Sequence, residues 1–120
     1  MAKMRGIKPD FWTDDDLIEC SPLARLLFIG LWTQMCDNGH CDDKPKQLKL
    51  RILPSDDCDV DRLLDELAEH GVIVRMGGYV KAPNLPAHQR IDKRYLALCQ
   101  WCSHDPDAVF TEADRPGRKP

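Results

Sequence analysis

The chain has 120 residues, of which 42% are hydrophobic and 31% are charged, and its formal net charge is -3. This length suits one ordinary domain with a tail, and this balance of apolar and charged residues excludes global disorder. No apolar run follows the first residues, and no stretch is as long as a membrane span. We therefore expect an intracellular protein without a signal peptide or membrane anchor.

Charge is strongly segregated along the chain. Residues 14–43 and 54–70 are acidic, whereas residues 44–53 and 71–104 are basic. A net-acidic protein is a poor non-specific DNA binder, because neutralisation of phosphates supplies most of that affinity. The two basic stretches predict a basic face only if the fold brings them together.

An N-terminal lead-in, a short acidic helix and a strongly apolar helix are the first expected elements. Residues 1–13 carry Phe11 and Trp12, which we expect to anchor on the core, and Thr13 is a candidate cap for a short acidic helix over 14–18. Ser21-Pro22 is a typical helix start, and the apolar spacing predicts a central helix that runs to about residue 35.

Two further helices and a hairpin follow. Lys44-Pro45 predicts a helix to about residue 53, and Asp59 is the expected cap of a third helix that ends before Gly71. In that third helix, apolar residues recur at helical spacing and leave an acidic outer face. The runs 72–76 and 79–82, joined by Gly77-Gly78, predict a tight β-hairpin.

These elements predict an α+β, mostly α protein with a winged-helix fold, in which a three-helix helix-turn-helix core is followed by a β-hairpin wing. We expect the winged-helix domain over residues 1–88. Residues 89–104 form a post-wing extension, with a helix expected over 91–102, and residues 105–120 are polar and proline-rich, which predicts a flexible tail.

Several runs resemble small helix-turn-helix proteins of phages and prophages. They are residues 7–12 (IKPDFW), 21–32 (SPLARLLFIGLW), 63–67 (LLDEL), Pro83-Asn84 and His88-Gln89. These proteins are similar to the N-terminal winged-helix domain of phage replication initiators and DnaD-like replisome organisers. The resemblance covers residues 5–93. It implies a DNA-binding protein in the cytoplasm of a bacterial host cell, with a role in DNA replication or transcription regulation, often as a homodimer.

The charge pattern leaves two interpretations of the binding surface open. Base readout by the third helix would depend on Arg62 alone among four carboxylates. A surface that follows the phosphate backbone is the favoured interpretation, and with Arg62 its candidate residues are Lys44, Lys46, Lys49, Arg51, Arg75, Lys81, Arg90, Lys93 and Arg94. The alternative is a protein-interaction module that binds a host or phage replication or transcription protein through Asp61, Asp65, Glu66 and Glu69.

The six cysteines indicate a second kind of site. Cys99 and Cys102 have the two-residue spacing of a zinc half-site, and Cys36, His40 and Cys41 are candidates for the remaining ligands. The alternative is that these thiols pack as small apolar groups, as we expect for Cys20 and Cys58. No nucleophile motif or phosphate-binding glycine loop is present, so the sequence does not indicate an enzyme.

Overall fold

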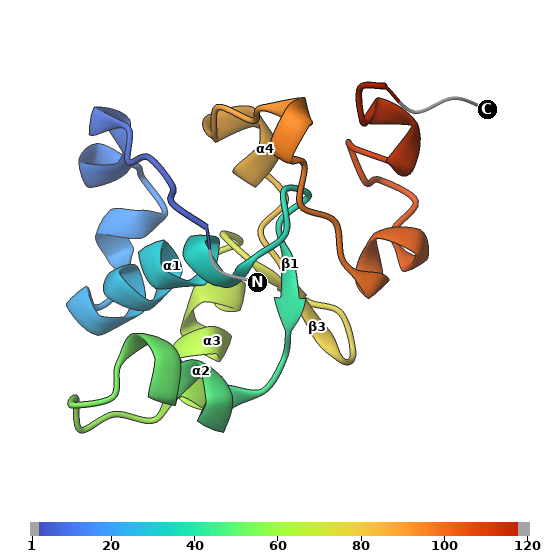
Figure 1. Ribbon diagram of the computed structural model, residues 1–120. Coiled ribbons are helices and arrows are strands. Elements are labelled where there is room, and N and C mark those ends of the chain that lie inside the picture. Colours follow the sequence, from blue (N-terminus) through green and yellow to red (C-terminus); the bar gives the residue numbers. More distant parts are fainter. Residues whose placement is uncertain (1–2, 118–120) are drawn as a thin grey trace.

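Over residues 3–117, which the structure describes, this computed structural model is α+β, with four α-helices and one three-stranded antiparallel sheet (Figure 1). The helices are α1 (Pro22–Gln34), α2 (Pro45–Ile52), α3 (Val60–Glu69) and the single turn α4 (Leu85–His88). The strands are β1 (His40–Asp42), β2 (Val74–Arg75) and β3 (Tyr79–Lys81). Five short 3-10 helices, η1 to η5, lie in the N-terminal and C-terminal segments.

The helical core forms largely where the sequence predicts it. The Ser21 hydroxyl accepts a hydrogen bond from the Ala24 N–H at the start of α1, and the Asp59 carboxylate caps α3. Gly71 ends α3 with a φ of 75°, a conformation that favours glycine. The apolar faces of these helices meet in one hydrophobic core, in which Leu27 and Leu64 are completely buried. The predicted bounds of the three helices are therefore confirmed to within a few residues.

The sheet contains one strand more than the predicted hairpin. The turn at Gly77 and Gly78 has positive φ angles of 70° and 104° and joins β2 to β3, as predicted. The additional strand, β1, pairs with the other edge of β3, which makes the sheet order β1-β3-β2. Residues 40–42 are too short and too polar to stand out as a strand in the sequence, and the pairing with β3 is what makes them one.

The N-terminal region forms two 3-10 turns, η1 (Pro9–Thr13) and η2 (Leu17–Glu19), in place of the helix predicted over 14–18. The Asp14 carboxylate, and not the Thr13 hydroxyl, accepts hydrogen bonds from the backbone N–H groups of the next turn. The expected anchoring of Phe11 is confirmed, since its ring is buried against Phe28 and Trp32. The Trp12 side chain, in contrast, is 58% exposed.

The helix predicted over 91–102 is wrong. The segment contains η3 (Lys93–Tyr95), a non-helical stretch, and η4 (Gln100–His104). The backbone N–H and C=O of Ala97 hydrogen-bond to the side chain and backbone of Asp37. These groups could not also close a helix, so a tertiary partner replaces the local hydrogen bonds.

Residues 105–117 do not form a free tail. The backbone of Phe110 exchanges hydrogen bonds with the Asn38 side chain, and the Arg115 guanidinium donates to the Leu96 carbonyl. A last turn, η5 (Glu112–Asp114), lies between these two contacts. The predicted tail over 105–120 is therefore attached as far as Arg115, and residues 118–120 lie outside the described part.

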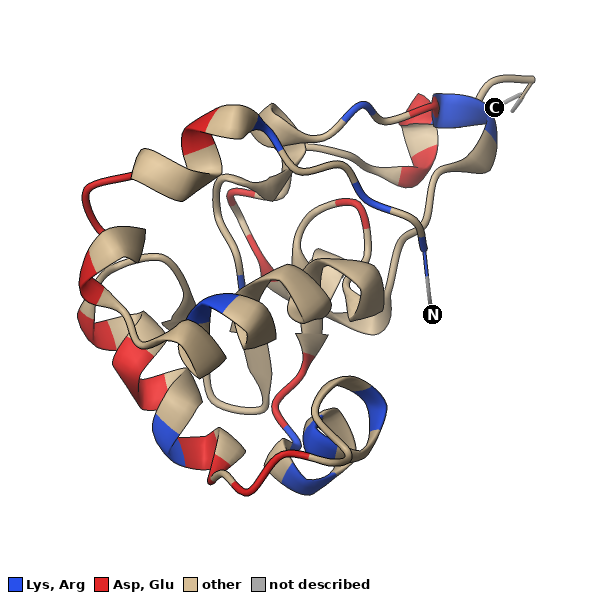
Figure 2. Cartoon of the chain, turned by 90° about the vertical axis from the view of Figure 1, so that its left-hand side faces the viewer, with Lys and Arg blue, Asp and Glu red and all other residues tan. Residues whose placement is uncertain are grey.

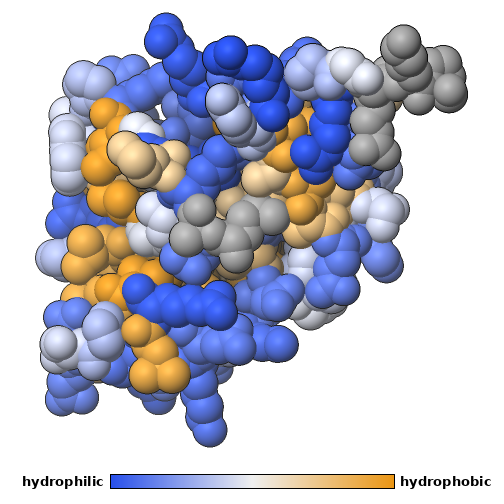
Figure 3. Space-filling view, viewed as in Figure 1, coloured by the Kyte–Doolittle hydropathy of each residue, from blue (hydrophilic) through white to orange (hydrophobic). Residues whose placement is uncertain are grey.

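Apolar side chains also reach the surface. Figure 3 shows them gathered on the left-hand side, where Figure 1 has the N-terminal turns and α1. Ile18 and Leu26, from these elements, are 52% and 49% exposed. Among the described residues, no helix is both long enough and apolar enough to cross a membrane.

Candidate metal centre

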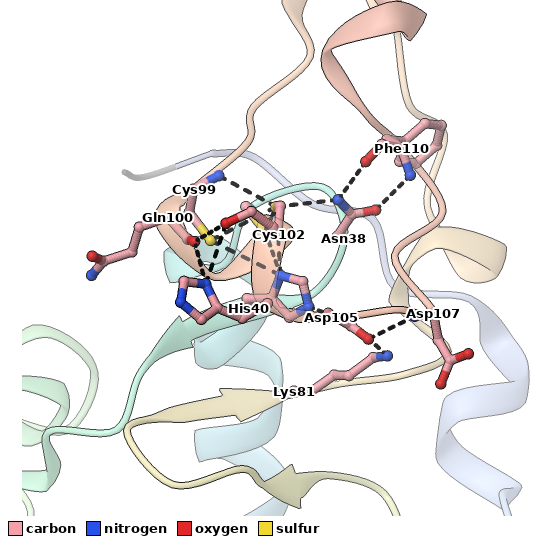
Figure 4. A network of polar contacts seen from close by, with 12 residues as sticks. Asn38, His40, Lys81, Cys99, Gln100, Cys102, Asp105, Asp107 and Phe110 are labelled. Atoms are coloured by element: carbon pink, nitrogen blue, oxygen red, sulfur yellow. Dashed lines mark hydrogen bonds and ion pairs between the residues drawn. The ribbon is translucent and has the colours of Figure 1, made fainter.

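Four potential metal ligands from two distant segments meet beside the sheet. Cys36 and His40 flank the turn that leads from α1 into β1, and Cys99 and Cys102 come from the C-terminal segment around η4. Their sulfur and imidazole nitrogen atoms all lie within 4.8 Å of one another. Figure 4 shows Cys99, Cys102 and His40 converging on one point. These four side chains could hold a metal ion such as zinc.

The distances agree with tetrahedral coordination. Zinc bonded to sulfur at about 2.3 Å places two sulfur ligands about 3.8 Å apart. The Sγ atom of Cys102 lies 3.7 Å from that of Cys36 and 3.9 Å from that of Cys99. The Nδ1 atom of His40 lies 3.4, 3.9 and 3.6 Å from the sulfurs of Cys36, Cys99 and Cys102, respectively. The cluster is therefore already spaced as a Cys3His site.

The fifth candidate ligand, Cys41, is not part of this group. Successive residues of a strand point to opposite faces of the sheet, so His40 and Cys41 cannot both face the cluster. Cys41 pairs in register with Val80, and both side chains are buried. Burial raises the pKa of the Cys41 thiol to about 12, so this thiol stays protonated. The prediction of Cys41 as a ligand is wrong.

Hydrogen bonds inside the cluster shift the pKa values of its members. The contact with Cys36 is the main cause that lowers the pKa of Cys99 to about 4, and it raises the pKa of Cys36. Burial alone would lower the pKa of His40, but hydrogen bonds to Cys99 and Asp105 raise it to about 9. A metal cation bound to these atoms would displace their protons.

The turn between α1 and β1 binds the two terminal segments at several points. The buried Asp37 carboxylate accepts from Lys3 Nζ at 2.7 Å, from Arg5 Nη1 at 2.7 Å and from the Ala97 N–H at 2.8 Å. Asn38, also buried, donates to the Phe110 carbonyl at 2.9 Å. Residues 36–40 therefore contact both terminal segments, and two of these residues, Cys36 and His40, are also candidate metal ligands.

Several cations predicted to contact DNA are engaged in ion pairs. Arg75 contacts Asp43, Asp61 and Asp65 at 2.7–2.9 Å, and Lys81 contacts Asp105 at 2.7 Å. Looser or more exposed pairs join Arg62 to Asp59, Lys93 to Asp114 and Arg94 to Asp92. Neither strand of the hairpin therefore carries an unpaired cation, and the wing is not the basic surface that the sequence predicted.

The cations of α2 remain together on the surface. Lys and Arg residues gather on this helix at the bottom of Figure 2, while α3 beside it is mainly acidic. Lys46 and Arg51 are exposed, and neither forms an ion pair within residues 3–117. Lys49 donates to the Leu53 carbonyl at the end of the helix, and Lys44 lies 4.0 Å from Asp42. Arg90 is also exposed.

The acidic face of α3 is partly committed to the fold. Asp61 and Asp65 pair with Arg75 but stay 59% and 61% exposed. The Glu66 carboxylate accepts from the backbone N–H and hydroxyl of Ser21, so it fixes the start of α1. Glu66 is therefore unsuited to the partner-binding role considered for it, whereas Glu69 remains exposed.

The His88-Gln89 motif joins the chain ends of the core domain. The Gln89 side-chain amide donates to the Gly6 carbonyl and accepts from the Gly6 N–H, at 2.9 and 2.8 Å. His88 Nδ1 lies 3.5 Å from Lys8 Nζ. Sequence analysis missed this role of Gln89, and also that of Asp105 at the metal centre, because neither has a local sequence signal.

Comparisons with known proteins add no relative: no family model, no curated protein and no solved structure matches this chain.

Proposed function

We propose that this protein is a winged-helix protein that binds double-stranded DNA through α2, with a structural zinc ion held by Cys36, His40, Cys99 and Cys102. The resemblance to phage proteins favours a role in DNA replication or transcription regulation.

The arrangement of elements supports a winged helix. The order α1, β1, α2, α3, β2, β3, with the sheet order β1-β3-β2, is the order expected for a helix-turn-helix core with a hairpin wing. The helices α1, α2 and α3 pack against one another. They lie together on one side of the sheet (Figure 1). In such folds α3 is the helix that enters the major groove, and here its acidic face disfavours base readout.

The chemistry of the ligands supports zinc in a structural role. Thiolate and imidazole ligands suit zinc, and a site with four protein ligands leaves no open position for a reacting water. The ligands also come in pairs from residues 36–40 and 99–102, so an ion would cross-link the core to the C-terminal segment. The proposed role of the ion is therefore structural.

The observation that carries the DNA proposal is the difference between α2 and the wing. Arg75 and Lys81 of the hairpin are held by carboxylates, whereas Lys46 and Arg51 of α2 are exposed and pair with no carboxylate among the described residues. Cations that are free to pair with phosphates release counterions on binding. Contact through α2 would therefore have weak sequence preference and a steep salt dependence.

Fluorescence anisotropy with labelled random duplex, at low and at physiological salt, tests this proposal. The double variant Lys46→Glu, Arg51→Glu should abolish binding. The variant Lys93→Glu, Arg94→Glu is the matched control, because it changes the charge equally at residues that already have carboxylate partners. An equal loss of duplex affinity in both variants would show that net charge, and not the α2 surface, controls binding. No binding by the unaltered protein at low salt would overturn the proposal.

A protein partner is the second candidate, and the exposure of the acidic α3 face favours it. Asp61, Asp65 and Glu69 present carboxylates to solvent beside the paired Arg75. In this case a replication or transcription protein of the host or phage would bind through a basic surface. The unaltered protein should capture this partner. Capture should be lost in Glu69→Lys and kept in Lys46→Glu, Arg51→Glu, the double variant that should abolish DNA binding.

A further inference from the structure

We propose that Asp105 and Lys81 form an outer shell of the metal centre, in which Asp105 orients His40 so that its Nδ1 atom faces the metal. The inference rests on the proposed zinc site and assigns two positioning residues to it. Neither residue was a candidate ligand, and Lys81 was predicted to contact DNA. The contacts around the imidazole ring carry the argument (Figure 4).

The hydrogen bond to Asp105 selects the tautomer of His40. The Nε2 atom of His40 lies 2.7 Å from Oδ2 of Asp105, and both side chains are almost completely buried. A carboxylate only accepts hydrogen bonds, so Nε2 must carry the proton. In the neutral ring the lone pair is then on Nδ1, the atom that faces the three sulfurs. Metal-binding histidines are commonly oriented by a carboxylate in this way.

Asp105 is itself held from two directions. Its Oδ2 atom accepts from Lys81 Nζ at 2.7 Å, and its Oδ1 atom accepts from the Asp107 N–H at 2.9 Å. The Lys81 side chain is only 12% exposed, so this pair is weakly screened by solvent. Because both oxygens accept hydrogen bonds, the carboxylate is held in one orientation, and its contact with Nε2 then orients the ring of His40.

The sheet explains why these groups meet. Lys81 of β3 lies directly opposite His40 of β1 in the antiparallel register. Tyr79 is two residues from Lys81, on the same face of β3, and its ring meets the His40 ring edge-on at 5.3 Å. The imidazole is therefore fixed by Tyr79 at its side and by Asp105 at its Nε2 atom. Both contacts depend on β3, because Tyr79 belongs to this strand and Asp105 is held by Lys81 of the same strand.

Charge balance gives Lys81 its second role. Zinc with three thiolates and a neutral imidazole carries one net negative charge, and the buried Asp105 would add another. The ammonium group of Lys81 compensates the added carboxylate within the buried site. A lysine used in this way is unavailable to DNA phosphates.

Zinc titration in competition with a chromophoric chelator tests the inference. Asp105→Asn, which keeps an acceptor but removes the charge, should weaken zinc binding about 10- to 100-fold. Lys81→Gln should weaken it by a smaller factor. Asp107→Asn is the matched control, since this exposed carboxylate lies on the same turn and only its backbone contacts Asp105. It should bind zinc like the unaltered protein.

Nitrogen-15 NMR of His40 separates positioning from a general structural effect. In the zinc-loaded protein, Nδ1 should show the shift of a metal-bound nitrogen, and Nε2 should carry a slowly exchanging proton. Asp105→Ala at saturating zinc should speed up that exchange while the cobalt-substituted protein keeps the absorption of three sulfur ligands and one nitrogen. An Nε2-bound metal, or equal zinc affinity in Asp105→Asn and Asp107→Asn, would overturn the inference. Absence of zinc binding by the unaltered protein would instead remove the proposed zinc site.

Discussion

The Asn38 side chain and the backbone of Phe110 exchange two hydrogen bonds across 72 positions of the chain. Asn38 Nδ2 donates to the Phe110 carbonyl at 2.9 Å, and Asn38 Oδ1 accepts from the Phe110 N–H at 2.7 Å. The buried amide thereby satisfies backbone groups that would otherwise pair with water. This contact fastens the chain beyond the metal ligands.

Replacement of Asn38 by Ala should loosen the C-terminal segment while the helical core stays folded. The variant loses the two hydrogen bonds to Phe110 and a third, from Asn38 Nδ2 to Cys102 Sγ at 3.2 Å. This loss costs about 1–3 kcal/mol, and the cost falls on the attachment of the C-terminal segment. Limited proteolysis should cut the variant faster within this segment than the unaltered protein. Equal cleavage rates, with zinc present in both samples, would show that the metal alone holds the segment.

Removal of the proposed zinc ion should lower thermal stability and expose Trp101. At a hundredfold excess over its Kd, a ligand that binds only the folded state contributes about 2.7 kcal/mol. The Trp101 ring stacks on Tyr79 with centroids 4.9 Å apart, and its indole N–H donates to Asp42. A chelator should therefore lower the Tm and shift tryptophan emission to the red. Trp101→Phe serves as the control, because it should show the Tm change without the spectral shift.

Asp37→Asn should destabilise the protein at neutral pH and much less in acid. Burial opposes the charge, but hydrogen bonds from Ala97, Lys3 and Arg5 keep the pKa of Asp37 below its usual value of 3.8. A lowered pKa gives stability that is present above the unfolded-state pKa and is lost as the pH falls through the folded-state pKa.

The loss in Asp37→Asn should be about 3 kcal/mol, because the variant leaves the buried Arg5 guanidinium without its carboxylate. Denaturant unfolding from pH 7 to pH 2 measures it, with chelator in all samples so that acid release of a metal does not contribute. The two stability curves should converge only below about pH 4. A constant difference across this range would contradict the assignment.

Gly30→Ala should destabilise the protein although alanine is the better helix former. A Cβ atom at this position of α1 would lie 2.2 Å from Cγ2 of Ile52 in α2. Overpacking of this kind costs about 1–3 kcal/mol, whereas an open helical position would gain up to about 1 kcal/mol. Adding Ile52→Val should leave most of the clash, because valine keeps the Cγ2 atom that lies 2.2 Å from the new Cβ. Adding Ile52→Ala should relieve it, as a double-mutant cycle would show.

Arg75→Ala should affect stability and not DNA binding. The variant leaves the carboxylates of Asp43, Asp61 and Asp65 close together without a cation, and we expect a loss of about 1–2 kcal/mol for this partly exposed cluster. The salt dependence of duplex binding should stay the same because Arg75 is not free to pair with phosphates. A weaker salt dependence of duplex binding in Arg75→Ala would show that the wing is part of the DNA-binding surface.

Local sequence signals accounted for the helical core and the hairpin. Ser21-Pro22, Asp59 and Gly71 mark helix ends through hydrogen bonds and backbone angles that involve only a few neighbouring residues. The Gly77-Gly78 turn has the same local character. Such features are predictable from sequence because their partners lie within one turn of the chain.

The metal centre was only partly predictable. The spacing of Cys99 and Cys102 indicated a half-site, and the pair Cys36 and His40 lay among the further candidates. The choice between His40 and Cys41, however, depends on which face of β1 meets the C-terminal segment. That strand exists because β3 pairs with it, so the sequence of residues 40–42 does not contain the answer.

The sequence by itself determined α1, α2, α3, the hairpin and the supply of thiols and cations. The tertiary structure alone decided which cations remain free, which thiols meet, and where the C-terminal segment lies. Those outcomes depend on partners tens of residues away, as for Arg75 with Asp43 or Lys81 with Asp105. An ion pair or a ligand cluster forms only when folding brings its members within a few ångströms, and no local pattern specifies that distance.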